Sequence, residues 1–440
     1  MHGVIQEILE LVMEIRAFKG WRFAPQEGGD ISGFIAPPYD VLTADDKQAL
    51  LDNCDKNIVG VDLPYVPPKR VGPDEVYARA AATISQWQAE GLLTQDDEPC
   101  LYVYEQTYTW AGTSYTRRAM LCGVRATELG VDVIPHEHTF AGPKADRLKL
   151  TKYTNLQLSP IFGFYNDPDR QITRILNTAA AGEPVAVGTL DSVQQKVWTI
   201  NDPAAIASIS DILDAEPAYI ADGHHRYSTA AKYAKKLRES GKIDEEHEAN
   251  FVMFALVAGD DPGLLVLPTH RVVTKLTDEF SMDVLRDVLG MFQWTKYEGD
   301  TPDLSDADAF LRPYGDGAML LIGPGGRDKW IIRLENRQAM VDAATDECQA
   351  WRALDVAILH TLVMNGVKSW SATEEPTVEY TPDGDKALDR CVNGGASLAI
   401  VMQGTPLQSV IDVADAGSSM PHKSTYFYPK LATGIVLKPL

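Results

Sequence analysis

Residues 218–227, Ala-Tyr-Ile-Ala-Asp-Gly-His-His-Arg-Tyr, decide the expected fold and the expected site. The run 218–221 is short and apolar, as in a buried strand, and 227–240 is typical of a helix with a Lys/Arg-rich outer face. Asp222 and Gly223 form the turn between them. The free backbone N–H groups and the dipole of a helix start favour a phosphate group. The segment therefore predicts a phosphate-binding strand–turn–helix unit.

The side chains of this turn add to that prediction. His224, His225 and Arg226 are further donors, and a guanidinium can bind two phosphate oxygens at once. Asp222 ends the strand, where its hard carboxylate oxygens suit Mg²⁺. The structural alternative is an Asp222 that caps the helix, with two histidines in local hydrogen bonds. Two adjacent histidines followed by arginine at one helix start favour the phosphate site.

A second polar segment, residues 134–139, reads Ile-Pro-His-Glu-His-Thr. Glu137 is a candidate general base, since proton abstraction needs one basic group within hydrogen-bond reach of a hydroxyl. His136 and His138 share a face if the backbone is extended, which would allow a zinc site, and His136 is also a candidate substrate-binding residue. A solvated surface loop is the structural alternative.

Lys144 and Arg147 lie one turn apart at the start of an expected helix. In an acidic protein, two such cations predict an anion clamp for phosphate or nucleotide. The alternative is a surface ion pair that involves Asp146.

Two later segments carry further candidate substrate-binding residues. One is 267–273, Leu-Pro-Thr-His-Arg-Val-Val, near the end of an expected strand, and the other is 420–430, in which basic and aromatic side chains alternate. Their candidates are Thr269, His270, Arg271 and Lys423. For each segment taken alone, a structural role is the stronger interpretation.

Composition excludes several classes of protein. Lys plus Arg is 40 and Asp plus Glu is 62, so the net charge is 40 − 62 = −22, which disfavours nucleic-acid and anionic-membrane partners. The five cysteines are scattered without a CxxC pair, which predicts a reducing cytoplasm and no disulfide scaffold. No apolar run reaches the roughly 18 residues of a membrane span. The first 20 residues are apolar at helical spacing but form a poor signal peptide, so they are either an amphipathic helix or an extension before Met13.

A chain of 440 residues suggests about three domains of an α/β or α+β class. We expect an N-terminal α+β region over 1–130, in which 100–109 and 115–127 form a β-hairpin. A catalytic core is expected over 131–277, and a C-terminal α+β region over 278–440.

Taken together, the motifs resemble domain-of-unknown-function family 1015 over the whole chain. The matching segments are Ala-Pro-Pro-Tyr-Asp-Val (36–41), Pro-His-Glu-His-Thr (135–139) with Asp146-Arg147, Ala-Asp-Gly-His-His-Arg-Tyr (221–227), Leu-Pro-Thr-His-Arg (267–271) and Met-Pro-His-Lys-Ser-Thr-Tyr-Phe-Tyr-Pro-Lys (420–430). The family name carries no function.

The pairing of the His-Glu segment with the Asp-Gly-His-His-Arg turn is also similar to the free L-serine kinases. This resemblance, over about 135–275, implies a core like that of ParB-type nucleotidases and sulfiredoxin. It also implies that Glu137 is the base toward the serine hydroxyl, and that residues 222–226 bind the phosphates and the metal. Sulfiredoxin chemistry would need a cysteine where this chain has Gly223-His224, and ParB-type partitioning would need a basic DNA-binding domain.

The expected function is a Mg²⁺-dependent phosphotransferase that makes O-phospho-L-serine from ATP, ADP or pyrophosphate. Glu137, Asp222 and His225 would be catalytic, while Lys144, Arg147 and Arg271 would stabilise phosphoryl charge or hold the substrate carboxylate. A nucleotide hydrolase and a nucleotide-binding regulatory protein without turnover stay open as alternatives. So does a metal-dependent hydrolase that uses His136, His138, His224 and His225.

Overall fold

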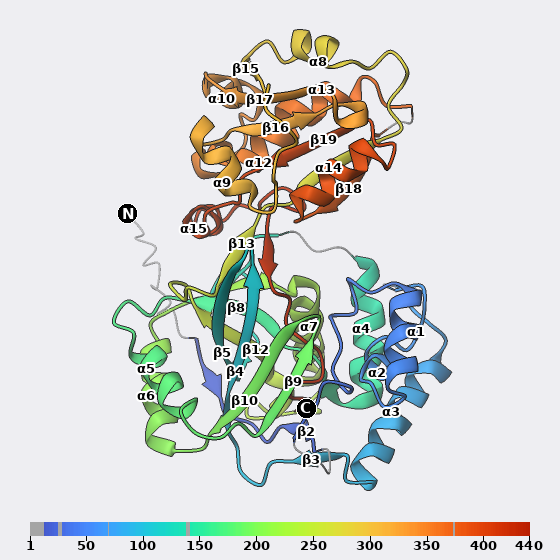
Figure 1. The fold of residues 1–440 in the computed structure, drawn as a ribbon. Helices are drawn as coiled ribbons and strands as arrows, with labels where there is room; N and C mark the ends of the chain where they lie inside the picture. Colours follow the sequence, from blue (N-terminus) through green and yellow to red (C-terminus); the bar gives the residue numbers. More distant parts are fainter. Residues whose placement is uncertain (1–12, 25–28, 69, 138–140, 373–374) are drawn as a thin grey trace, which may run out of the picture. The chain divides into compact units, whose positions relative to one another are not determined.

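The computed structural model describes residues 13–24, 29–68, 70–137, 141–372 and 375–440. The chain divides into two compact units: unit 1 comprises the chain up to Leu264 together with Pro429–Leu440, and unit 2 is Leu265–Tyr428. Each unit combines strands and helices, which confirms the expected mixed α/β class (Figure 1). The apolar N-terminal segment, for which the sequence leaves two interpretations, lies mainly outside the described residues.

A mixed sheet of nine described strands forms the centre of unit 1, in the order β6-β11-β8-β12-β5-β4-β10-β9, with β1 paired to β5. The β6–β11 and β8–β12 pairs are parallel, and the other neighbours are antiparallel. Its strands are β1 (Ile15–Arg16), β4 (Leu101–Trp110), β5 (Thr113–Arg125), β6 (Val133–Ile134), β8 (Ile161–Tyr165), β9 (Ala186–Leu190), β10 (Val193–Ile200), β11 (Ala218–Asp222) and β12 (Phe251–Ala258). Two small antiparallel pairs join β2 (Trp21–Phe23) to β3 (Leu93–Gln95), and β7 (Leu156–Gln157) to β21 (Lys438–Pro439).

The central strands have the sequence features that their positions require. All eight residues of β12 are buried, as expected for a strand covered on both faces. The predicted β4–β5 hairpin is confirmed. Its two-residue turn places Ala111 at φ 46° and Gly112 at φ 75°, the left-handed conformation that matches the twist of the paired strands.

In Figure 1, α5 and α6 lie to one side of these strands and α1–α4 lie to the other. Ile172 and Leu176 of α5, and Ile209 and Leu213 of α6, are buried in the same core as the strands. The helices of unit 1 are α1 (Ala44–Asn53), α2 (Val59–Asp62), α3 (Asp74–Ala89), α4 (Ala141–Thr154), α5 (Gln171–Ala179), α6 (Pro203–Leu213), α7 (His224–Glu239) and the 3₁₀ turn η1 (Glu248–Asn250).

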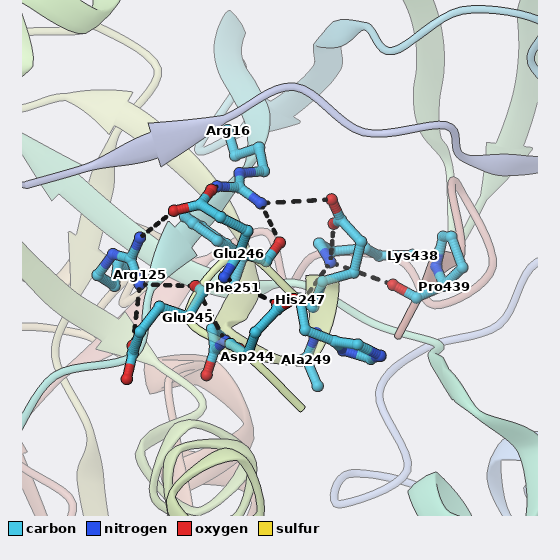
Figure 2. Close-up of polar contacts among 12 residues, drawn as sticks. Arg16, Arg125, Asp244, Glu245, Glu246, His247, Ala249, Phe251, Lys438 and Pro439 are labelled. Carbon is cyan, nitrogen blue, oxygen red and sulfur yellow. Dashed lines mark hydrogen bonds and ion pairs between the residues drawn. The ribbon is translucent and has the colours of Figure 1, made fainter. Parts of the chain in front are cut away.

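Figure 2 shows a cluster of ion pairs, here called the Lys438 cluster, that attaches the C-terminal strand to unit 1. The Lys438 side chain is fully buried, and its ammonium donates to the Glu248 carboxylate at 2.8 Å and to the Glu248 carbonyl at 3.0 Å. The guanidinium groups of Arg16 and Arg125 lie over the Phe251 ring, at 3.8 and 4.8 Å from its centroid. Charges from distant parts of the sequence therefore neutralise one another around one aromatic ring.

Unit 2 contains a six-stranded antiparallel sheet in the order β15-β17-β16-β19-β14-β18, within the described residues. Its strands are β14 (His270–Thr274), β15 (Phe292–Lys296), β16 (Met319–Ile322), β17 (Lys329–Leu334), β18 (Thr377–Thr381) and β19 (Leu398–Met402), and a separate pair joins β13 (Leu265–Leu267) to β20 (Tyr426–Tyr428). The antiparallel pairing of β16 with β17 forms a hairpin around residues 323–326.

Helices lie on both faces of the unit 2 sheet, because its strands alternate between two apolar cores. On β19, Leu398, Ile400 and Met402 belong to one core, and Ala399 and Val401 to the other. The first core includes residues of α8 (Met282–Val288), α10 (Gln338–Ala343), α12 (Asp355–Ile358), α13 (Asn365–Lys368) and α15 (Leu407–Asp415), and the second those of α9 (Ala307–Leu311) and α14 (Gly384–Val392). Shorter elements are α11 (Gln349–Ala353), the 3₁₀ turns η2 (Arg312–Tyr314) and η3 (Pro324–Gly326), and the π-helical turn η4 (Leu359–Met364).

The division into units differs from the three regions expected from the sequence. The predicted boundary at 130/131 falls between β5 and β6, which belong to the same sheet, and the boundary at 277/278 falls inside unit 2. The last residues of the chain belong to unit 1, where β21 pairs with β7. A unit boundary that is set by strand pairing between distant segments is not marked by a linker-like stretch of sequence.

Candidate active site

The structure brings the two principal motifs together through a parallel pair of strands. Val133 of β6 pairs with Ala218 of β11, and Ile134 pairs with Tyr219. Parallel strands end at the same edge of a sheet, so the residues that follow β6 lie beside those that follow β11. The His136 N–H accordingly donates to His224 Nε2 at 3.3 Å, across 88 residues of sequence.

Gly223 makes the turn between β11 and α7 possible. Its φ of 98° and ψ of 19° are left-handed, a conformation that favours glycine. A Cβ at this position would lie 3.1 Å from Arg226 Nη2 and 3.1 Å from Ile161 Cδ1. Glycine is therefore favoured here both by the backbone conformation of the turn and by the close approach of Arg226 and Ile161. The N-cap residue of α7 is Gly223, which has no side chain to cap the helix, and a helix start of this kind favours an anionic ligand.

Asp222 is the electrostatic centre of the site. Its Oδ1 accepts from Lys430 Nζ at 2.9 Å, and its Oδ2 accepts from Arg226 Nη2 at 2.9 Å. Burial alone would raise the pKa of Asp222, but Lys430 and Arg226 hold this pKa far below its usual range. Asp222 is therefore an ionised carboxylate at the end of a strand, beside a helix start.

Two neutral histidines lie next to this carboxylate. The rings of His136 and His224 meet edge to face, with centroids 4.7 Å apart. Burial lowers the pKa of His136, and burial together with His136 lowers the pKa of His224 well below its usual value. Since His224 Nε2 accepts the His136 N–H, the ring proton of neutral His224 lies on Nδ1. The two histidines thus add one oriented donor, the Nδ1–H group of His224, without adding charge.

Arg226 is held by the protein rather than left open to a phosphate. Its Nη1 donates to Ser159 Oγ at 3.0 Å and to the Pro160 carbonyl at 2.6 Å, while Nη2 donates to Asp222. The sequence predicts a bidentate phosphate ligand here. In the structure Arg226 instead orients Asp222, because it reaches back one helical turn to that carboxylate.

Arg147 is likewise enclosed. It donates to Asp62 at 2.9 Å and to Asp146 at 2.7 Å, and its guanidinium lies 3.9 Å from the centre of the Tyr39 ring. Burial would lower the pKa of Arg147, but Asp62 and Asp146 raise this pKa above its usual value. Two buried carboxylates thus neutralise the charge of Arg147 in the structure, and its role in a phosphate clamp stays a prediction.

A hollow of about 50 Å³ lies between these two arginines and is lined by Asp62, Arg147, Ser159 and Arg226. Such a volume has room for one or two water molecules and none for a nucleotide. Arg147 and Arg226 thus lie around the same hollow, together with Asp62.

A larger groove runs along α7 and has a volume of about 560 Å³. Ser228, Lys232 and Lys235 line it, together with Glu128 and Leu129 from the segment before β6. Positions 228, 232 and 235 follow residue 224 at helical spacing, so the groove lies on the face of α7 that begins with His224.

Lys144 of α4 lies close enough to Lys232 that burial and this second charge both lower the pKa of Lys144. The predicted cation at Lys144 therefore has Lys232 as a cationic neighbour.

Among the remaining predicted residues of unit 1, the structure describes Glu137 and His225 but not His138 or Thr139. Glu137 is described, and its charge raises the pKa of His136 against the effect of burial. His225 is the second residue of α7. His138 and Thr139 lie outside the described residues, and the zinc interpretation of His136 with His138 lies there with them.

Thr269, His270, Arg271 and Lys423 belong to unit 2. His270 is fully buried, and its Nδ1 accepts from the Met402 N–H at 3.3 Å. Arg271 is the next residue of β14 and points to the opposite face. The Lys423 carbonyl accepts from Arg271 Nη2 at 3.0 Å, while the Lys423 side chain is exposed.

Lys430 is the site residue that sequence reasoning missed. The segment 420–430 contains two lysines, and the sequence singled out Lys423. Only the tertiary structure shows that Lys430 returns to unit 1 and pairs with Asp222 across 208 positions. The one available signal was its place at the end of a family-like motif.

Asp222 is also the residue that could bind a metal ion. Each of its oxygens accepts one described hydrogen bond and keeps a second lone pair. Within the described residues, no three His, Cys, Asp or Glu side chains form a metal-binding group. The arrangement thus fits Mg²⁺ that is bound mainly through phosphate oxygens, with one or two carboxylates from the protein.

The chain belongs to the family described as "Protein of unknown function (DUF1015)", whose model matches residues 15–357. The resemblance to family 1015 is thereby confirmed. A search of curated proteins found no match to the sequence. Among the described helices, none is both long enough and apolar enough to cross a membrane.

Solved structures found by comparison include the kinase group that the motifs resemble. A free serine kinase in complex with AMP matches at 10% identity and a TM-score of 0.33, covering 67% of this chain and 83% of that one. A conserved hypothetical protein from Pyrococcus furiosus matches at 12% identity and 0.32, covering 68% and 90%. SbnI with a C-terminal truncation, from Staphylococcus aureus, matches at 10% identity and 0.34, covering 71% and 85%.

Proposed function

We propose that unit 1 carries the active site of a small-molecule phosphotransferase, most simply a kinase that phosphorylates the hydroxyl of free L-serine. One observation carries this proposal: the parallel β6–β11 pair places the segment of Glu137 beside the Asp222–His224 turn. A candidate base and a candidate phosphate site, separated by more than 80 residues in sequence, thus lie at one edge of the sheet. Phosphoryl transfer needs this kind of positioning, together with charge neutralisation.

The phosphoryl donor would lie with its phosphates over the start of α7, where backbone N–H groups and Nδ1–H of His224 are donors. The groove along α7 has the volume for the rest of a nucleoside polyphosphate, and Lys232 and Lys235 line it. Lys144, next to Lys232, would add positive charge near the phosphates. ATP and ADP fit this arrangement, and pyrophosphate would use only its phosphate-binding part.

Glu137 would act as the general base. It takes the proton of the serine hydroxyl as that oxygen forms a bond to the terminal phosphorus of the donor. The bridging P–O bond breaks, and its electron pair leaves with the shortened donor. The products are O-phospho-L-serine and the donor with one phosphate fewer, and the proton remains on Glu137 until solvent removes it. His225, the second residue of α7, would assist at the same phosphates.

Asp222 and Lys430 would adjust the charge of the site. Mg²⁺, when bound, would neutralise the phosphate oxygens, and Asp222 would hold it. Lys430 could then exchange Asp222 for a phosphate oxygen, since an ammonium binds phosphate as a point charge. Arg226 would keep the Asp222 carboxylate oriented throughout.

Two finer predictions belong to this proposal. One is that the core of unit 1 is of the ParB/sulfiredoxin-like kind. The other is that His136 contacts the substrate.

Phosphorus NMR tests the proposal directly. The purified full chain is given Mg²⁺ and L-serine with ATP, ADP or pyrophosphate in turn. We expect a phosphoserine resonance for the wild type, and a loss of turnover by at least about 10²-fold for Glu137→Gln. Nucleotide binding should persist in this variant, because the phosphate site over α7 is intact. Glu183→Gln is the matched control, since Glu183 is exposed and precedes β9, at the opposite edge of the sheet from β6.

The other outcomes separate the alternatives. Inorganic phosphate that accumulates at the same rate without serine would indicate a hydrolase. A stoichiometric thermal shift with nucleotide but no product would indicate a binding protein. Equal loss of turnover and nucleotide binding in Glu137→Gln would contradict the role of Glu137 as a base.

A further inference from the structure

Arg271 in unit 2 is a buried cation with no ion-pair partner among the described residues. The residue is 1% exposed, and no ion pair joins it to a carboxylate of the described residues. Nη1 donates to the Thr269 carbonyl and to Met402 Sδ, while Nη2 contacts His360 Nε2 at 2.9 Å and the Lys423 carbonyl at 3.0 Å. All four of these acceptors are neutral.

One donor of Arg271 has no acceptor at all: its Nε is buried and makes no hydrogen bond to a described residue. A buried charge normally requires a partner, because the transfer of an ion out of water costs several kcal/mol. Burial lowers the pKa of Arg271 to about 10, which still leaves the group charged near neutral pH. The protein therefore retains a full positive charge that its own described residues do not neutralise.

The surroundings of Arg271 are built around a hollow of about 220 Å³. Arg271 and His360 lie in its wall, together with Asn365, Lys368, Val378 and Tyr380. His360 reaches this position from the π-helical turn η4, a kind of irregularity that often occurs at functional sites. The volume corresponds to roughly seven water molecules at about 30 Å³ each, so it suits a small molecule rather than a nucleotide.

The charges of the wall agree with an anionic occupant. Lys368 also lines the hollow and forms an ion pair with Glu375, which is another lining residue. Asn365 can donate through its amide, and the Arg271 guanidinium lies 5.5 Å from the centre of the Tyr380 ring. Apolar side chains such as Met364 and Val378 complete the lining and would cover a short carbon chain.

We propose that the hollow under η4 is a binding site for a small oxyanion, a carboxylate or phosphoryl group on a compact metabolite, neutralised by Arg271. The site lies wholly within unit 2, and it is independent of the phosphotransfer proposed for unit 1. It would give unit 2 a ligand of its own.

The test measures thermal unfolding of the full chain while inorganic phosphate or malonate is titrated against potassium chloride of equal ionic strength. We expect a saturable rise in Tm with at least one of the two anions beyond that with chloride, and the anion that binds tighter identifies the oxyanion class. Arg271→Met should weaken this binding at least tenfold. Arg286→Met is the matched control, since it removes one positive charge from the exposed surface of α8 and should leave binding unchanged.

A second variant keeps the test valid if Arg271→Met does not fold. Val378→Phe fills part of the hollow but leaves Arg271 in place, and it should also weaken binding at least tenfold. The proposal is overturned if neither anion raises Tm beyond chloride. It is also overturned if every variant that folds among Arg271→Met and Val378→Phe binds like the wild type.

Discussion

Lys438 of unit 1 and Arg271 of unit 2 are both buried cations, 0% and 1% exposed, but of the two only Lys438 has a carboxylate partner among the described residues. The Lys438 ammonium has three acceptors, and one of them is the carboxylate of Glu248 (Figure 2). Arg271 has only neutral acceptors among the described residues, and its Nε has none.

This difference separates a charge that holds the fold together from one available to a ligand. Lys438 attaches the C-terminal strand, and a ligand there would have to displace Glu248. Arg271 lies beside an open hollow, so an added anion would neutralise it without displacing a carboxylate. Asp222 in unit 1 is an intermediate case, since Lys430 and Arg226 neutralise it but each of its oxygens keeps a lone pair.

The largest stability effect is expected when the partner of Lys438 is removed. Glu248→Ala leaves a fully buried ammonium without its carboxylate, which should lower the free energy of unfolding by about 3 kcal/mol. Lys438→Met removes the buried charge itself and should cost less, because Glu248 is 36% exposed and water can solvate it. Urea unfolding of both variants measures the difference. An equal or larger loss for Lys438→Met would show that charge neutralisation is not what Glu248 supplies.

A smaller, pH-dependent effect is expected beside Arg271. Burial, with the Arg271 charge adding to it, lowers the pKa of His270 from 6.5 to about 3. Below pH 6.5 the unfolded chain binds a proton that the folded chain does not, so stability should fall by about 1.4 kcal/mol per pH unit toward pH 3. His270→Asn keeps an acceptor for the Met402 N–H but cannot ionise. Between pH 6.5 and 5, this variant should therefore lose about 2 kcal/mol less free energy of unfolding than the wild type.

Thermal unfolding of the full chain at several pH values measures this slope. His247→Asn is the matched control, because exposed His247 also accepts a backbone N–H, that of Ala249 at 3.2 Å. The control should follow the wild type. If His270→Asn has the same pH slope as the wild type, the neutral buried state of His270 does not limit stability.

The smallest effect is expected at the rim of the Lys438 cluster. Glu246 forms an ion pair with Arg16, but the Glu246 side chain is 75% exposed. Glu246→Ala should lower the free energy of unfolding by less than about 1 kcal/mol, since water and salt screen exposed pairs. The same urea series checks this value against Glu248→Ala. A loss as large as that of Glu248→Ala would remove the distinction between buried and exposed partners in this cluster.

Much of the local structure could be predicted from the sequence. The β4–β5 hairpin follows from two apolar runs around Ala111-Gly112, and the β11–turn–α7 unit follows from an apolar run, a glycine and a helix-forming stretch. Both signals are local, because turn chemistry and periodicity depend on neighbouring residues.

The roles of the charged residues could not be predicted in the same way. Arg147 and Arg226 are basic residues in motifs, but their acceptors, Asp62 and Ser159, lie 85 and 67 positions away. The unit boundaries could not be predicted either, because β21 at the end of the chain pairs with β7, far away in sequence.

The sequence by itself determined the mixed α/β class, the family and the two motifs that meet at the candidate active site. Each of these depends on residue type and short spacing, which the chain carries locally. Only the tertiary structure decided which charges are neutralised: Arg147 by Asp62 and Asp146, Asp222 by Lys430, and Lys438 by Glu248. The energy of a charge depends on its burial and its nearest partners, and both are set by contacts between distant parts of the sequence.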